Sequence, residues 1–89
     1  MSTNDKVIIT CALSGVVTSR AQCPAIPYTV EDFAREAKRA WDAGATVLHI
    51  HARTDDGMPD YTAARYRAIG DAIRAVCPII LNFSTGIID

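Results

Sequence analysis

Short apolar runs alternate with amphipathic segments along this sequence, and their order constrains the fold more than any other feature. The runs at residues 7–12, 46–51 and 79–83 are rich in β-branched residues and have the length of buried strands. Between them, residues 29–44 and 62–76 carry apolar side chains at helical spacing. Such alternation is typical of a parallel sheet with right-handed crossovers. We therefore predict an α/β fold in the order β-α-β-α-β.

Helix boundaries are marked by residues that stabilise or terminate a helix. Thr29 and Asp32 have the spacing of a capping box, in which each side chain bonds the other residue's backbone N–H. Gly44 is a typical C-terminal stop, and Pro78 cannot continue the second helix. The two helices should therefore begin and end close to these positions.

Two helices can cover only one face of a three-stranded parallel sheet, so the other apolar face would stay open. We therefore predict that residues 1–89 are the N-terminal part of a single TIM (β/α)8 barrel domain of roughly 250 residues. A truncated gene product, a proteolysed sample and an incompletely recorded sequence would each account for an end at Asp89.

Composition and charge exclude several classes of protein. The chain is 49% hydrophobic and 21% charged, with a net charge of −1, which indicates a globular protein. It has neither a basic cluster for nucleic acid or anionic lipid nor an apolar run near the ~18 residues that span a bilayer. Cys11, Cys23 and Cys77 are odd in number and fit no zinc or redox spacing. We expect a cytoplasmic protein with reduced thiols and no nucleic-acid or membrane partner.

His49 and His51 are the residues best suited to chemistry. Alternate residues of a strand point to the same face and are spaced about 6.6 Å along it. Both imidazoles should therefore lie on one face of the sheet, with Leu48 and Ile50 on the other. Catalytic groups collect at the carboxyl ends of parallel strands, and two neutral imidazoles there can bind a divalent metal such as zinc. The alternative is a pair of core histidines bonded to carbonyl oxygens.

The His-x-His pattern also occurs in other classes of metal-binding protein. By itself it supplies only two of the ligands that a catalytic metal site needs. Jelly-roll cupins carry it, but its place in a βαβ series argues against them; amidohydrolase barrels usually carry it on their first strand. A catalytic zinc normally has three protein ligands, and the chain has no third histidine. Glu31 and Glu36 lie on a predicted helix that faces away from the mouth of the barrel. A third ligand is therefore expected from outside this sequence.

Polar residues near the strand ends are further candidates. Ser84, Thr85 and Gly86 follow the third strand, where hydroxyl and N–H groups could hold a carboxylate or carbonyl oxygen, or simply form a turn. Asn82 should point to the same side as Ser84 and support the site. Arg53 could bind a substrate carboxylate or pair with a nearby aspartate, Asp55 or Asp56.

With these residues in place, the chain resembles the β-keto acid cleavage enzyme family over essentially its whole length. The order and spacing of the matching blocks are far more specific than His-x-His alone. These blocks are Ile9–Gly15, Ile26–Asp32, Ala43–Arg53, Asp56–Pro59 and Ser84–Gly86.

The resemblance implies a barrel enzyme that is usually homo-oligomeric. His49 and His51 match two histidine ligands of the family's zinc, whereas the glutamate ligand and the aspartate base would lie beyond residue 89. The family condenses a β-keto acid with acetyl-CoA and releases acetoacetate and a new acyl-CoA. The 89 residues alone are therefore expected to be inactive. Another metal-dependent barrel lyase or hydrolase, and a non-catalytic βαβαβ module, are the competing hypotheses.

By the same resemblance, Ser84 contacts the substrate, and we predict a substrate-binding segment made of Ser84, Thr85, Gly86 and Ile87. Ile87 replaces a second glycine of the family pattern. Val17 stands where a relative that acts on an amino-bearing substrate has a glutamate. The apolar side chain predicts a substrate with a neutral or apolar side group.

Overall fold

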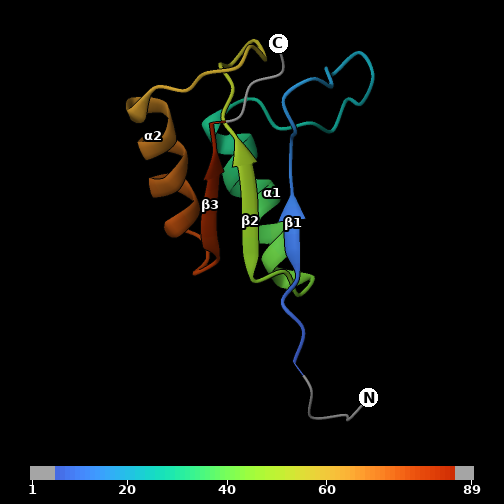
Figure 1. Ribbon diagram of the computed structural model, residues 1–89, viewed down its shortest axis with the longest axis vertical. Coiled ribbons are helices and arrows are strands. Elements are labelled where there is room, and N and C mark those ends of the chain that lie inside the picture. The colour runs from blue at the N-terminus through green and yellow to red at the C-terminus, as the bar shows by residue number, and fades with distance from the viewer. Residues whose placement is uncertain (1–5, 86–89) are drawn as a thin grey trace.

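The computed structural model describes residues 6–85, and its elements follow the predicted order. The three strands are parallel and lie side by side in the order β1-β2-β3, as Figure 1 shows. This α/β unit is compatible with part of a (β/α)8 barrel. The elements are β1 (Thr10–Ala12), α1 (Val30–Asp42), β2 (Val47–His51), α2 (Ala63–Arg74) and β3 (Ile80–Ser84).

The first strand is shorter than the sequence predicted. Residues 7–9 lie before β1, and their side chains are between 50% and 77% exposed. The reason is register, because Thr10 pairs with Val47, the first residue of β2. Of the three earlier residues, Ile9 contacts that strand only through its carbonyl oxygen, which accepts from the N–H groups of Thr46 and Val47. The prediction of a strand covered on both faces from Val7 onward is therefore wrong for this segment.

The first helix begins with the predicted capping box. The Thr29 hydroxyl accepts from the Asp32 backbone N–H at 3.0 Å, and the Asp32 carboxylate accepts from the Thr29 N–H at 3.2 Å. Burial by itself would raise the pKa of Asp32, but hydrogen bonds from Thr29, Arg35 and Tyr28 outweigh it and hold that pKa well below its ordinary value. The charged carboxylate thus stabilises the helix start.

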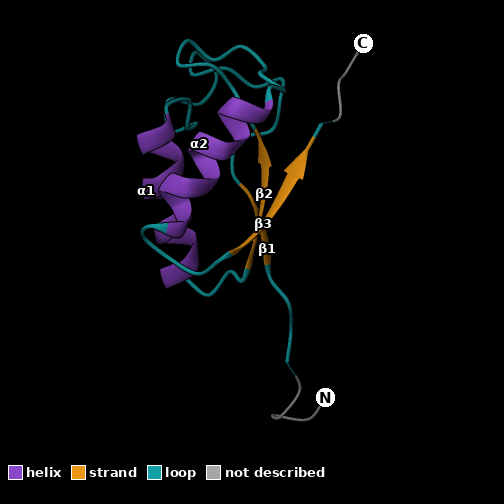
Figure 2. Ribbon diagram, turned by 90° about the vertical axis from the view of Figure 1, so that its left-hand side faces the viewer, coloured by secondary structure: helices purple, strands orange, loops and turns teal. Residues whose placement is uncertain are grey.

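Both helices pack on one side of the sheet, as Figure 2 shows, and the core lies between them and that face. Its largest fully buried apolar side chains are Phe33, Leu48, Ile50, Ile69 and Ile73. Burying these side chains is the main stabilising contribution to the unit. Among residues 6–85, no helix is long and apolar enough to cross a lipid bilayer.

The opposite side of the sheet, here called the uncovered face, has no helix of the described chain over it (Figure 2). Strand register places on it Thr10 and Ala12 of β1, Val47, His49 and His51 of β2, and Ile80, Asn82 and Ser84 of β3. One covered and one open face is the arrangement that the sequence predicted. The candidate site lies on the open one.

Candidate metal and substrate site

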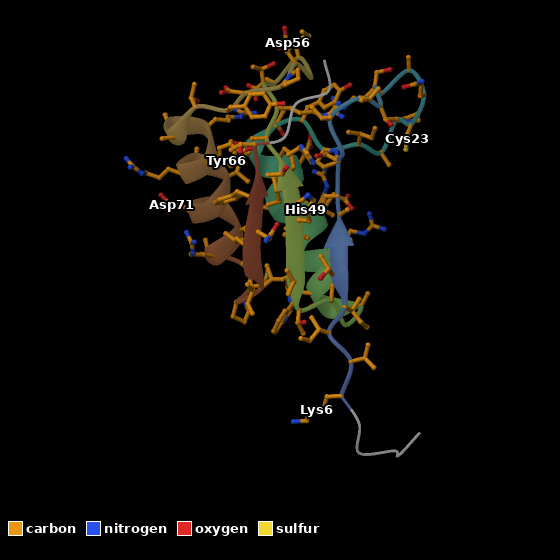
Figure 3. All side chains as sticks on the ribbon, in the orientation of Figure 1. Lys6, Cys23, His49, Asp56, Tyr66 and Asp71 are labelled. Atoms are coloured by element: carbon orange, nitrogen blue, oxygen red, sulfur yellow. The ribbon has the colours of Figure 1, made fainter. Side chains whose placement is uncertain are left out.

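His49 and His51 lie on the uncovered face of the central strand, on the opposite side from Leu48 and Ile50, which are 0% exposed. Figure 3 labels His49 over β2, well above Lys6 and below Asp56, on the way to the carboxyl end of the sheet. The two imidazole rings are 5.2 Å apart between centroids, with an interplanar angle of 79°. Strand alternation thus brings the rings together, as the sequence predicted.

The distance between the two imidazole rings fits two ligands of the same metal ion. Zinc bonds to imidazole nitrogen are about 2.0–2.1 Å, and two such bonds at about the tetrahedral angle place ring centroids roughly 5 Å apart. Within the described chain, His51 Nδ1 is buried and has no hydrogen-bond partner. A buried nitrogen without a partner requires an explanation, and a bound cation supplies one.

The protonation state of His51 also suits a ligand. Burial lowers its pKa first of all, and the nearby His49 and Arg53 charges lower it further. A lowered pKa keeps the imidazole neutral around pH 7, and only a neutral imidazole has a lone pair for a metal.

The described residues do not contain a complete metal site. No cluster of three or more His, Cys, Asp or Glu side chains suited to a metal occurs in residues 6–85. Glu36 lies on α1, on the covered side of the sheet, and pairs with Arg39 at 2.8 Å. This position agrees with the prediction that the helix glutamates face away from the histidines.

Residues of β3 flank the histidines in register. His49 pairs with Asn82, and His51 pairs with Ser84. The Asn82 Oδ1 lies 2.7 Å from His49 Nδ1. The backbone oxygen of Ser84 accepts a hydrogen bond from the Tyr66 hydroxyl of α2. Asn82 and Ser84 therefore share the histidine face, as predicted.

The predicted substrate segment is only partly described. Thr85 follows β3 and is exposed, whereas Gly86 and Ile87 lie outside the described residues. Hydroxyl groups of Ser84 and Thr85 thus stand at the carboxyl end of the strand beside the histidines.

Arg53 does not pair with Asp55 or Asp56, which was one of the two roles that the sequence allowed. Its side chain is buried, with the residue 1% exposed, and donates to the backbone oxygens of Ser14 at 3.1 Å and Gly15 at 3.0 Å. Asp55 pairs instead with Arg65 at 2.9 Å. The partners of Arg53 lie in the loop between β1 and α1, almost forty residues earlier, so local sequence could not identify them.

Three further contacts, none of them predicted from the sequence, involve the loops that follow β1 and β2. The Ser14 hydroxyl donates to the His51 backbone oxygen at 3.0 Å. The Tyr28 hydroxyl accepts from the Arg20 N–H at 2.8 Å, and its ring packs against Gly57. The available signal in the sequence was Asp55-Asp56-Gly57, which marks a turn, and Gly57 has the positive φ, 94°, that such a turn needs.

Comparison with known proteins gives consistent matches. A family model described as beta-keto acid cleavage enzyme matches residues 6–89. Over 83 residues, 92% of this chain and 30% of the relative, the chain is 47% identical to the 3-keto-5-aminohexanoate cleavage enzyme of Acetoanaerobium sticklandii. The protein of that name in Fusobacterium nucleatum matches at 47% with the same shares.

A third relative carries a different substrate in its name. The 3,5-dioxohexanoate:acetyl-CoA acetone transferase of Paraburkholderia graminis is 37% identical over 87 residues, 97% of this chain and 28% of the relative. The chain therefore spans about 30% of the length of the curated relatives that it matches.

Proposed function

This chain belongs to the β-keto acid cleavage enzyme family, and from this premise we propose that it is the N-terminal part of an enzyme acting on a β-keto acid and acetyl-CoA. The products would be acetoacetate and a new acyl-CoA. The relatives are named as cleavage enzymes and acetyl-CoA transferases, which supports a reaction of this kind.

We propose that the chain contributes the first three strands of a (β/α)8 barrel formed by a single domain. The uncovered face would then be the barrel interior, where side chains of neighbouring strands pack in layers. The chain has three parallel strands with both helices on the same side of the sheet, which supports its assignment to a barrel. The carboxyl end of the sheet, with the histidines and the Ser14–His51 contact, would be the active-site end.

His49 and His51 would hold a zinc ion, with a third ligand from a later part of the barrel. When bound, zinc supplies a Lewis acid that polarises the keto and carboxylate oxygens of the substrate. The chain's own contribution is to keep two neutral imidazoles side by side, and the lowered pKa of His51 serves that purpose. The general base would also lie in the later part.

Ser84 and Thr85 would bind an oxygen of the substrate, continued by Gly86 and Ile87. Their place beside His51 at the end of β3 supports this role. Val17, 67% exposed in the loop between β1 and α1, would contact the substrate side group. An apolar residue there disfavours a substrate ammonium group, which loses water without gaining a partner.

The cellular setting is a proposal of the same kind. The three cysteines are free, which agrees with the reducing cytoplasm. We expect a homo-oligomer, because the family resemblance implies one; light scattering of the purified protein would measure the mass.

The observation that carries the proposal is the pair of imidazoles on the uncovered face, 5.2 Å apart. The test is acyl exchange by the purified full-length enzyme of which this chain would be the N-terminal part, the parent of all variants below. The reaction is followed by mass spectrometry of CoA thioesters with a panel of neutral and amino-bearing β-keto acids. We expect acetyl-CoA to be converted into a new acyl-CoA with release of acetoacetate, faster for neutral substrates. Folded, zinc-loaded protein that exchanges no member of the panel would contradict the proposal.

A further inference from the structure

Asn82 lies beside His49 on the uncovered face and contacts one specific atom of its ring. The two residues are Cα partners in the parallel pairing of β2 and β3, so their side chains point the same way. Asn82 Oδ1 lies 2.7 Å from His49 Nδ1, a distance typical of a strong hydrogen bond.

The chemistry of that contact determines the tautomer of His49. The Asn82 Oδ1 is a carbonyl oxygen and can only accept, so Nδ1 of His49 must carry the proton and donate it. A neutral imidazole protonated on Nδ1 has its lone pair on Nε2. In free histidine the proton favours Nε2, and the Asn82 contact reverses that preference.

From this contact we infer that Asn82 is a positioning residue that holds His49 in the tautomer and orientation in which Nε2 binds the metal. The inference rests on the proposed zinc site and adds a role that the ligand pair alone does not give. Ligating histidines usually donate their other N–H to a fixed acceptor, and loss of that acceptor weakens metal binding about 10–100-fold.

Only the ring of His49 contacts Asn82, so the positioning role of Asn82 concerns His49 and not His51. His51 Nδ1 is buried and lacks a hydrogen-bond partner among residues 6–85. The Ser14 hydroxyl bonds only the main chain of His51, at 3.0 Å, and so fixes the strand rather than the ring. Asn82 should therefore affect the orientation of His49 and leave that of His51 unchanged.

An amide orients the ring without adding a charge. A carboxylate at the same place would accept the same proton and would also attract the cation. Asn82→Asp therefore preserves the acceptor, whereas Asn82→Leu has a similar size and removes it. Ile80→Val, two residues earlier on the same face of β3, is the matched control.

The first measurement is spectroscopic and needs no metal. Long-range ¹H–¹⁵N NMR of the metal-free protein reports which ring nitrogen of His49 is protonated, with a His49→Gln spectrum for assignment. We expect the Nδ1–H form in the parent, in Asn82→Asp and in Ile80→Val, and a shift toward Nε2–H in Asn82→Leu. Protonation of Nε2 in the parent would overturn the inference.

The second measurement is zinc affinity by competition with a chromogenic chelator. We expect Asn82→Leu to bind zinc roughly 10–100-fold more weakly, with Asn82→Asp and Ile80→Val within about threefold of the parent. Equal affinity of the parent and Asn82→Leu would overturn the positioning role and leave the zinc site standing. A parent that binds no zinc would overturn the proposed metal site, and the inference that rests on it, whatever the tautomer.

Discussion

The Arg53 guanidinium holds the backbone of Gly15, donating to its oxygen through Nη2 at 3.0 Å and Nε at 3.3 Å. Through this contact the end of β2, where the histidines lie, is joined to the loop that carries Val17. The arginine also lies 5.4 Å from the centroid of the Tyr28 ring. A buried cation thus links the main chain of two segments that both border the candidate site.

Arg53→Lys should destabilise the protein although it keeps the charge. Lysine cannot reproduce the fork that donates to both Ser14 and Gly15, so the buried Ser14 carbonyl and the partly buried Gly15 carbonyl lose donors. We expect a loss of about 1–3 kcal/mol in the free energy of unfolding, measured in urea. Arg39→Lys on the exposed side of α1 is the control, with a change within about 0.5 kcal/mol. Equal stability of the two variants would contradict this role.

Gly57→Ala should be more damaging than Gly44→Ala. Both glycines have positive φ, 94° and 111°, so both substitutions strain the backbone. A Cβ at Gly57 would also lie 2.4 Å from the Tyr28 ring, whereas one at Gly44 meets nothing within 4 Å. We expect thermal unfolding to show an additional loss of roughly 1–3 kcal/mol at Gly57. Similar melting temperatures for the two variants would show that the ring moves away freely.

The Asp32 carboxylate should stabilise the protein only above mildly acidic pH. Its native pKa is lowered, whereas its unfolded pKa is about 3.9. Its contribution is therefore complete above the unfolded pKa and is lost as pH falls toward the native one. At pH 7, Asp32→Asn should cost about 1 kcal/mol, as loss of a cap does.

The pH series provides the check on Asp32. The difference in unfolding free energy between the parent and Asp32→Asn should be constant above about pH 5 and shrink below about pH 4. Asp71→Asn, on the exposed side of α2, should show no such pH dependence. A difference for Asp32→Asn that grows as the pH falls would refute the assignment.

Val17→Glu should change which β-keto acid is preferred. A carboxylate at this exposed position would give a substrate ammonium group the partner that valine lacks. We expect the ratio of kcat/KM for amino-bearing over neutral substrates to rise on the order of tenfold. Val17→Gln, uncharged and of similar size, should leave the ratio near that of the parent. An equal rise in both variants would exclude a charge effect.

Local patterns in the sequence were sufficient to predict the elements and the face of each strand residue. Strand alternation placed His49 and His51 together, and the capping box at Thr29 is confirmed. These features depend on neighbours within a few residues, where periodicity and capping act directly.

The features that the sequence did not predict depend on partners far away in the chain. The run from Val7 was predicted as strand, but where pairing starts is decided by the beginning of β2. The role of Arg53 depended on carbonyl groups of a loop whose path no local pattern specifies. The Asn82–His49 contact needed the register of β3 against β2, which only the fold supplies.

The metal-ligand role of His49 and His51 is the central claim, and zinc stoichiometry with affinity tests it most directly. Metal-free protein would be titrated with zinc in the parent, His49→Ala, His51→Ala and Cys23→Ser, the last removing an exposed thiol as a control. We predict about one zinc per chain in the parent and in Cys23→Ser, with affinity reduced more than about 100-fold in either histidine variant. Zinc bound at parental affinity by both histidine variants, or no zinc bound by the parent, would contradict the account.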